Sequence, residues 1–267
     1  MEVEILEKSE NKAKFILNGV SAQFANALRR IMIAEVPVMA IDDVVIVENN
    51  SAMTDEVLAH RLGLIPIRTD LKTYVLPEDC GCKSELGCNK CSVTLTLDVD
   101  ASDNSQVVYS DEMSSANPDV TPLSRIPIVK LVKGQGIRLE AYARLGRGKA
   151  HAKWQPVSVC AYKFLPQVKI NLGKCDSCRK CVEVCPKHIL QIKDNKLEVT
   201  DIMKCTLCKE CVRACPKNSV DVSWDETKFI FNVETTGALP VEQVVEEAAK
   251  ILEEKTKIFV QEVSKLR

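Results

Sequence analysis

Aromatic residues are scarce in this sequence of 267 residues, at 4%, so valine, isoleucine and leucine must build its core. Histidine is scarcer still, with three residues, His60, His151 and His188. None of them has a nucleophile or a pair of carboxylates at a readable spacing, and we predict no catalytic residue. The net charge is only −1, which gives no general electrostatic reason to bind nucleic acid or an anionic membrane.

Long apolar runs are also missing. No segment reaches the roughly eighteen apolar residues that a membrane-spanning helix needs. The first residues, MEVEILEKSENKAK, lack the apolar region of a signal peptide. We therefore expect a soluble, cytoplasmic protein.

Cysteine, by contrast, is abundant, with 13 residues. In a chain without an export signal, this number favours metal ligation in a reducing compartment over a disulfide framework. Eight of the cysteines fall in two copies of one spacing, C-x2-C-x2-C-x3-C-P. The copies read CDSCRKCVEVCP from Cys175 and CTLCKECVRACP from Cys205.

This spacing holds [4Fe–4S] clusters in bacterial-type ferredoxins, where the fourth cysteine of each run ligates the other cluster. The predicted ligands of the first cluster are Cys175, Cys178, Cys181 and Cys215. Those of the second are Cys205, Cys208, Cys211 and Cys185. Two zinc knuckles or a disulfide set are the alternatives. A zinc site needs four ligands and does not require the repeated third cysteine and proline.

A second group of cysteines lies earlier, in CGCKSELGCNKC. Its four thiols can make a closed tetrahedral zinc site, and they are Cys80, Cys82, Cys88 and Cys91. The spacing is less diagnostic than a double C-x2-C, so disulfides or an unmetallated loop stay open. Cys160 stands alone in an alternating strand, where a free cysteine usually acts as a small core residue.

Two helices are predicted in the first part of the chain. One begins at Ser21, a good N-cap, and ends before Pro37, with Phe24, Ala27, Leu28 and Ile31 on one face. The polar residues on the other side form either a solvated face or a docking surface, and they are Asn26, Arg29 and Arg30. A shorter helix runs from the cap Thr54 to Gly63.

Several strands and turns are predicted around these helices. VVIVE, at 44–48, is typical of a buried strand, and SVTLTLDVD, at 92–100, of a half-buried one. A hairpin is expected about Gly134–Gly136, with alternate residues from Ile137 to Ala143 on one face, and a smaller one about Asp194–Asn195. KFIFNVETTG is a last strand, and GRGK at 146–149 is a turn, since it lacks the full phosphate-loop motif.

The chain closes with one long predicted helix that begins at Pro240. At 1.5 Å per residue its 28 positions span about 40 Å. Its apolar stripe contains Val241, Val245, Ala248, Leu252, Phe259 and Val263. A single small β-layer cannot cover so long a stripe, so we expect it to cover a sheet and then meet a partner helix; an ordinary long core helix is the alternative.

Four segments resemble a known family: FANALRRIMIAEVPVMAID, LAHRLGLIP, GRGKAHAKWQPVS, and ETTGALP with the helix that follows. They look like the D-type subunit of archaeal RNA polymerase. That protein is the counterpart of the N-terminal domain of the bacterial alpha subunit and of the third-largest subunit of eukaryotic polymerase II. A subset of the family carries a ferredoxin-like insert, and all eight of its cysteines are present here.

The resemblance implies an α+β fold with two insertions. A discontinuous alpha-like dimerisation domain would take residues 1–37, 157–170 and 222–267. A β-rich domain would occupy 38–156, and a ferredoxin-like domain with two [4Fe–4S] clusters would occupy 171–221. CGCKSELGCNKC falls where the eukaryotic relative carries a zinc loop, although its middle spacer is longer here.

The resemblance also implies partners and a role. The chain would form a heterodimer with subunit L, which then seeds addition of small subunits N and P and the two largest subunits. Asn26, Arg29 and Arg30 sit where the family contacts the second-largest subunit. The implied function is assembly of a DNA-directed RNA polymerase for transcription, without catalytic residues or direct nucleic-acid contact, and with structural or regulatory clusters. The competing class is a ferredoxin-like electron-transfer subunit of an oxidoreductase, for which the sequence offers no flavin or nicotinamide motif.

Overall fold

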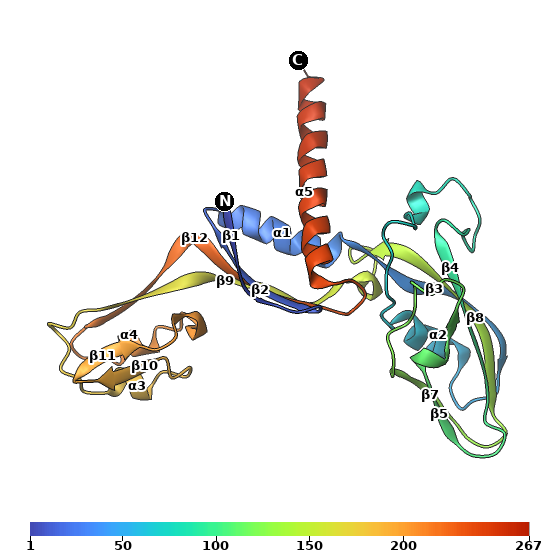
Figure 1. Ribbon diagram of the computed structural model, residues 1–267, viewed down its shortest axis with the longest axis horizontal. Helices are drawn as coiled ribbons and strands as arrows, with labels where there is room; N and C mark the ends of the chain where they lie inside the picture. Colours follow the sequence, from blue (N-terminus) through green and yellow to red (C-terminus); the bar gives the residue numbers. More distant parts are fainter. Residues whose placement is uncertain (267) are drawn as a thin grey trace. The chain divides into compact units, whose positions relative to one another are not determined.

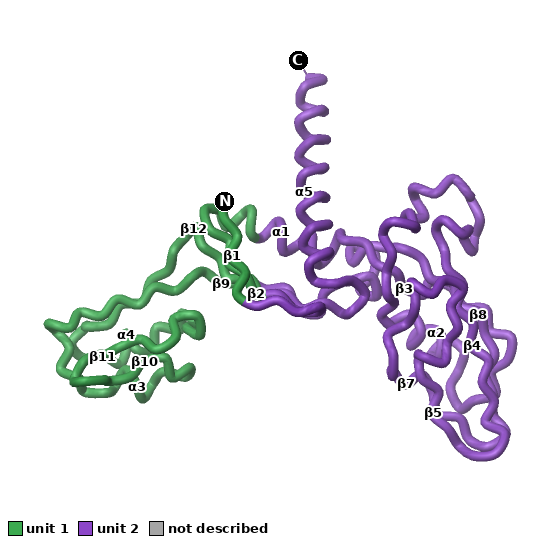
Figure 2. The backbone as a smooth tube through the Cα atoms, viewed as in Figure 1, with its two compact units in different colours: residues 1–6, 14–25, 162–231 green, residues 7–13, 26–161, 232–267 purple. Residues whose placement is uncertain are grey.

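A computed structural model describes residues 1–266 as a mixed α+β protein (Figure 1). Two compact units divide the chain (Figure 2). The first takes residues 1–6, 14–25 and 162–231, and the second takes 7–13, 26–161 and 232–267. Each unit is thus assembled from segments that are far apart in the sequence.

A four-stranded sheet has the order β1-β2-β12-β9. Its strands are β1 (Glu2–Lys8), β2 (Lys12–Asn18), β9 (Val157–Ile170) and β12 (Val220–Thr235). Several of the few aromatic residues meet here: Phe15 stacks on Phe231 at 5.2 Å between ring centroids, and Tyr162 packs edge-on against Phe229 at 5.4 Å. The predicted last strand is confirmed, with Phe229 and Phe231 fully buried.

Helix α1 (Ala22–Ala34) begins after Ser21, whose hydroxyl accepts a hydrogen bond from the backbone N–H of Phe24 at 3.3 Å. This confirms the predicted cap. The buried face differs from the predicted one, because Ala25 and Met32 are buried while Phe24 and Ala27 are only partly covered. Leu28 and Ile31 are buried as expected.

A second sheet, of order β3-β8-β4-β6, lies in the second unit. Its strands are β3 (Pro37–Asn49), β4 (Ser92–Asp100), β6 (Ser114–Ser115) and β8 (Gly136–Arg147). The predicted alternation of β4 is confirmed, with Val93, Leu95 and Leu97 buried. Helix α2 (Asp55–Gly63) contributes Leu58 and Leu62 to the same core and has the predicted bounds.

Two strand predictions in this region are wrong. β7 (Pro127–Leu131) pairs with β5 (Gln106–Tyr109) and not with β8, so Gly134 turns the chain between two sheets rather than within a hairpin. VVIVE is not fully buried either: Val45 lies on the solvent face of the sheet, opposite the exposed Glu140 of β8, and Val45 and Val47 are 43% and 63% exposed. The alternate residues from Ile137 to Ala143 are buried as predicted.

The GRGK segment, predicted as a turn, is a strand end followed by a turn. β8 ends at Arg147, and the residues after it turn into the short 3-10 helix η3 (Ala152–Trp154). Gly146 lies against the ring of Trp154 so closely that no Cβ would fit. The glycine therefore serves packing between the strand and η3, and the other 3-10 helices are η1 (Pro77–Asp79), η2 (Ser110–Glu112) and η4 (Ile202–Lys204).

The cysteine-rich segment of the first unit contains β10 (Leu190–Lys193) and β11 (Lys196–Val199), which form the predicted small hairpin. Asp194 and Asn195 at its turn have φ angles of 47° and 58°, as a two-residue hairpin turn requires. Two single-turn helices, α3 (Lys180–Glu183) and α4 (Glu210–Arg213), complete the segment.

Helix α5 (Val241–Ser264) follows Pro240, as predicted, and its 24 residues span about 36 Å. Its first half is anchored by Val241, Val244 and Ala248, which are buried. Its second half exposes apolar side chains to solvent, and the exposed residues of this half are Ile258, Phe259, Val260 and Val263. No helix in residues 1–266 is long and apolar enough to cross a membrane.

Candidate metal centres

The two cysteine runs of the first unit have the same backbone conformation, offset by thirty residues. Left-handed φ angles occur at Ser177 and Leu207, at Arg179 and Lys209, and at His188 and Asn218. Each run then enters a single helical turn, at α3 or α4. Non-glycine residues in this region of φ cost about 1–3 kcal/mol each unless the surrounding structure offsets it, which makes the repeated conformation a specific feature of both runs.

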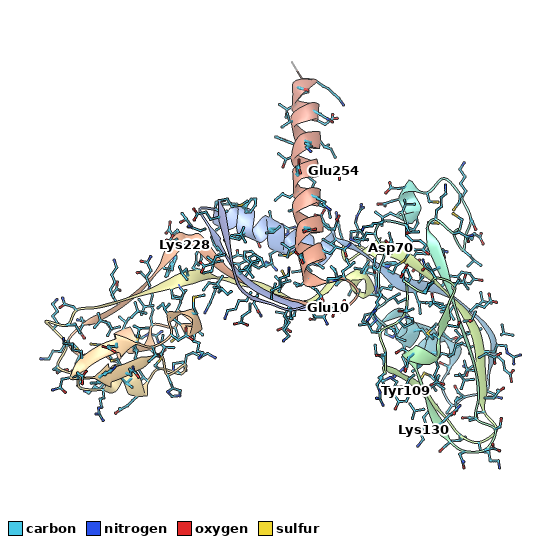
Figure 3. All side chains as sticks on the ribbon, in the orientation of Figure 1. Glu10, Asp70, Tyr109, Lys130, Lys228 and Glu254 are labelled. Carbon is cyan, nitrogen blue, oxygen red and sulfur yellow. The ribbon has the colours of Figure 1, made fainter. Side chains whose placement is uncertain are left out.

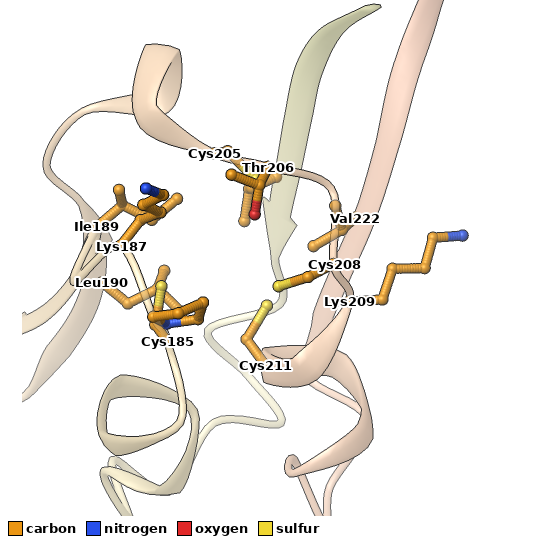
Figure 4. Close-up of a pocket in the computed structure, with 12 residues that line it drawn as sticks. Cys185, Lys187, Ile189, Leu190, Cys205, Thr206, Cys208, Lys209, Cys211 and Val222 are labelled. Atoms are coloured by element: carbon orange, nitrogen blue, oxygen red, sulfur yellow. The ribbon is translucent and has the colours of Figure 1, made fainter. Parts of the chain in front are cut away.

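Four cysteines from the two runs line one small pocket (Figure 4). Cys185 comes from the first run, and Cys205, Cys208 and Cys211 come from the second. The remaining lining is largely apolar and includes Val168, Ile189, Leu190 and Val222. Burial raises the pKa of the Cys211 thiol to about 11, and the charges of the other three cysteines contribute in the same direction.

The other four cysteines of the runs also form one electrostatic group. Burial raises the pKa of the Cys181 thiol, and repulsion from Cys215, Cys175 and Cys178 adds to the effect. Cys181 and Cys215 are buried, at 6% and 7% exposure. Each group has the same members as one predicted ligand set, and ligation of iron by them stays a prediction.

Lys163 on β9 makes polar contacts with the second cysteine run, and the sequence analysis did not predict them. Its ammonium donates hydrogen bonds to the backbone carbonyls of Met203 and Cys205, over 2.6 Å and 2.7 Å. Partial burial lowers the pKa of Lys163. The lysine therefore holds the backbone at the start of the second cysteine run, and no local motif marks it in advance.

The second unit brings together Cys80, Cys82, Cys88 and Cys91, whose sulfur atoms all lie within 4.8 Å of one another. Cys80 and Cys88 are 3.7 Å apart, as are Cys82 and Cys91, and Cys88 lies 3.9 Å from Cys91. Four Zn–S bonds of about 2.3 Å in a tetrahedron separate the sulfurs by about 3.8 Å. The four cysteines can therefore hold one metal ion, and all are free thiols rather than disulfides.

The thiols of this group differ in how readily they ionise. A hydrogen bond from the backbone N–H of Lys90 lowers the pKa of Cys88 to about 7, whereas burial raises that of Cys91 to about 12. The backbone N–H of Cys88 also donates to the sulfur of Cys91 over 3.3 Å. Backbone donors of this kind are those that stabilise bound thiolates.

Two arginines of β8 hold the polypeptide around these cysteines. Arg144, whose side chain is 14% exposed, pairs with Asp43 at 2.7 Å and donates to the backbone carbonyl of Glu85 inside the loop. Arg147 pairs with Glu78 at 2.5 Å, just before the first cysteine. The loop is thus tied to the sheet by side chains that sequence reasoning missed, because their partners lie about 60–70 residues away in the chain.

The predicted partner-binding residues lie on α1. Asn26 accepts hydrogen bonds from Arg29 at 3.3 Å and 3.0 Å, so these two side chains already satisfy part of each other's hydrogen-bonding capacity. Arg30 is exposed. On α5, Lys255 pairs with Glu35 at 2.5 Å, and beyond this point Ile258, Phe259, Val260 and Val263 are exposed. Figure 3 draws the side chains of α5 as sticks, with Glu254 labelled.

The fold contains the kind of domain through which RNA polymerase subunits pair. Residues 14–256 match the family model of the RNA polymerase Rpb3/Rpb11 dimerisation domain. Curated relatives named DNA-directed RNA polymerase subunit Rpo3 extend the match over nearly the whole chain. The relative from Archaeoglobus fulgidus is 46% identical over 95% of this chain and 94% of its own length. Those from Methanosphaera stadtmanae and Pyrococcus horikoshii are 43% and 40% identical, and cover 96% and 100% of this chain and 96% and 99% of their own lengths.

The chain therefore belongs to the archaeal Rpo3 family of DNA-directed RNA polymerase subunits, the D-type family that the sequence motifs indicated.

Proposed function

We propose that this chain is a non-catalytic assembly subunit that pairs with a small subunit of the L type and then supports docking of subunits N and P and of the two largest subunits. The observation that carries the proposal is the second half of α5. There Ile258, Phe259 and Val260 are 54%, 68% and 60% exposed on a well-formed helix. An exposed apolar surface of this kind is typical of a protein interface.

The charge pattern of α5 fits pairing with another helix. Lys257 pairs with Glu253 at 2.5 Å and Lys250 with Glu247 at 2.6 Å, so several charges on the polar side of the helix are paired within the helix. The exposed apolar side chains are the part of α5 that we propose for the partner. Arg30 on α1, which is also exposed, is the residue we propose to reach the second-largest subunit, together with Asn26 and Arg29.

Co-expression with subunit L tests the proposal. We expect a stable one-to-one complex in size-exclusion chromatography. Phe259→Asp should abolish it, because a charge in the middle of a buried apolar contact has no partner. Gln261→Asp is the matched control, since it adds the same charge to another exposed position of the helix. A stable monomer that ignores subunit L would contradict the pairing.

The donor sets fit the metals that the sequence predicts. Two groups of four cysteines, drawn crosswise from the two runs, fit two [4Fe–4S] clusters with ligands Cys175, Cys178, Cys181, Cys215 and Cys205, Cys208, Cys211, Cys185. The tetrahedral spacing of Cys80, Cys82, Cys88 and Cys91 fits one zinc ion. We propose three modules: dimerisation (1–37, 157–170, 222–267), β-rich (38–156) and ferredoxin-like (171–221).

The clusters would have a structural or regulatory role in assembly. Around its cysteines the ferredoxin-like segment has a short hairpin, two single helical turns and the 3-10 helix η4. Metal binding commonly supplies the folding free energy of so small a core. A role as an electron carrier for an oxidoreductase has no support from the relatives, which are named as polymerase subunits.

A further inference from the structure

The two cysteine runs differ at one buried position beside the crossing ligand. The fourth residue after Cys215 is Ser219, whereas the fourth residue after Cys185 is Ile189. Both side chains are buried, at 4% and 3% exposure. The thirty-residue repeat therefore places a hydroxyl beside one crossing cysteine and a hydrocarbon beside the other.

Ser219 contacts the sulfur of Cys215 with two polar groups. Its backbone N–H donates to Cys215 Sγ over 3.3 Å, and its Oγ lies 3.1 Å from the same sulfur. A metal-bound thiolate carries no proton, so the serine hydroxyl must be the donor once Cys215 is a ligand. Ile189 has no polar side-chain atom, so its side chain cannot donate a hydrogen bond to Cys185 Sγ.

We propose that Ser219 is a positioning residue that tunes the first cluster and makes it chemically distinct from the second. The inference rests on the proposed function, because it requires both clusters to be present. Reduction of a cluster adds one electron, and therefore one negative charge, from an external donor such as dithionite; no bond is formed or broken. Hydrogen bonds to ligand sulfurs stabilise that added charge and raise the reduction potential.

The second cluster site has the apolar side chains of Ile189, Leu190 and Val222 in its lining, together with the polar side chains of Thr206, Lys187 and Lys209. The position that corresponds to Ser219 is occupied there by Ile189. The ammonium of Lys163 donates to the carbonyls of Met203 and Cys205 rather than to a sulfur. The two clusters should therefore respond to different substitutions, and the exchange of Ser219 and Ile189 supplies a reciprocal test.

The test is a potentiometric titration of the full chain in complex with subunit L, purified anaerobically and followed by electron paramagnetic resonance. In Ser219→Ala we expect about a tenfold fall in the ratio of reduced to oxidised first cluster at a fixed potential, equivalent to about 59 mV for one electron. Ser219→Thr keeps the hydroxyl and should restore the parental value. Ile189→Ser should move the potential of the second cluster upward and leave the first unchanged.

Iron content separates this inference from the proposed function. The parental protein should hold about eight irons per chain. If the parental protein is free of iron, both the proposed clusters and the role of Ser219 are wrong. With eight irons and unchanged potentials in Ser219→Ala, the clusters stand and the role of Ser219 is overturned. Iron loss in Ser219→Ala that Ser219→Thr repairs supports the role. Equal loss of iron in Ser219→Ala and Ser219→Thr would show that Ser219 acts through packing alone, and would overturn the proposed role.

Discussion

Single side chains decide how the cysteines are held, and Lys163 is the clearest case beside Ser219. Its ammonium donates to two carbonyls at the start of the second run, over 2.6 Å and 2.7 Å. One of those carbonyls belongs to Cys205, a proposed ligand. A hydrogen bond from a charged donor contributes about 1.5–3 kcal/mol, so this lysine stabilises the backbone that would hold the proposed second cluster.

We predict that Lys163→Met speeds the loss of iron from the second cluster about tenfold in air, since about 1.4 kcal/mol corresponds to a factor of ten. The measurement is the decay of cluster absorbance together with bound iron at each time. Lys169→Met is the control, because Lys169 lies on the same strand and is exposed. Equal decay in the two variants would show that the contact to Met203 and Cys205 is of no consequence.

At the scale of elements, β8 connects the sheet to the loop of four cysteines. Arg144 reaches from the strand to Asp43 on β3 and to the carbonyl of Glu85 in the loop. This contact orients the segment between Cys82 and Cys88 without touching a sulfur. Mutation of residues that orient metal ligands without binding the metal typically lowers metal affinity by about 10- to 100-fold.

Arg144→Met should therefore weaken zinc binding by about 10- to 100-fold, measured by competition with a chromogenic chelator. Arg138→Met is the control: Arg138 is on the same strand and forms an exposed ion pair with Asp98 at 3.0 Å. An exposed pair of this kind contributes about 0–1 kcal/mol. If Arg144→Met and Arg138→Met release zinc alike, the contact of Arg144 with the loop does not contribute to zinc binding.

The elements also mark where sequence reasoning succeeds and where it stops. Helix α2, the alternation of β4 and the turn at Asp194–Asn195 depend on residues close in the chain, and all three were predicted. The pairing of β7 with β5 depends on contacts about twenty residues apart, which periodicity does not encode. The exposure of Val45 follows from its place on the solvent face of the sheet, opposite Glu140, which a run of four apolar residues does not indicate.

The same division applies to the candidate metal centres. The spacing of the cysteines predicts the two ligand sets, because a run of three close cysteines cannot supply the fourth ligand itself. Ser219 and Lys163 were missed. Ser219 becomes noticeable only when the two cysteine runs are aligned at their thirty-residue offset. The alignment places buried Ser219 opposite buried Ile189.

At the scale of the whole molecule, the dimerisation domain and the cluster segment have separate sources of stability. Val241, Val244 and Ala248 of α5 are buried without any help from a metal. Cys181, Cys185, Cys205 and Cys215 are instead buried in a second core, which they share with Val220 and Val222 of β12 and which Val168 and Ile170 of β9 pack against. Loss of the clusters should therefore unfold one part of the chain and leave pairing with subunit L intact.

The double substitution Cys181→Ser with Cys211→Ser tests this separation, because it removes one proposed ligand from each cluster. We expect the variant to bind subunit L like the parent but to recover substoichiometric amounts of the two largest subunits when the tagged chain is purified from cells. Cys160→Ser is the control, since Cys160 is a half-buried cysteine of β9 outside both ligand sets. Subunit stoichiometry is the decisive measurement. Fully assembled, transcribing polymerase without iron would show that the clusters are dispensable for assembly, and would favour a redox role for them.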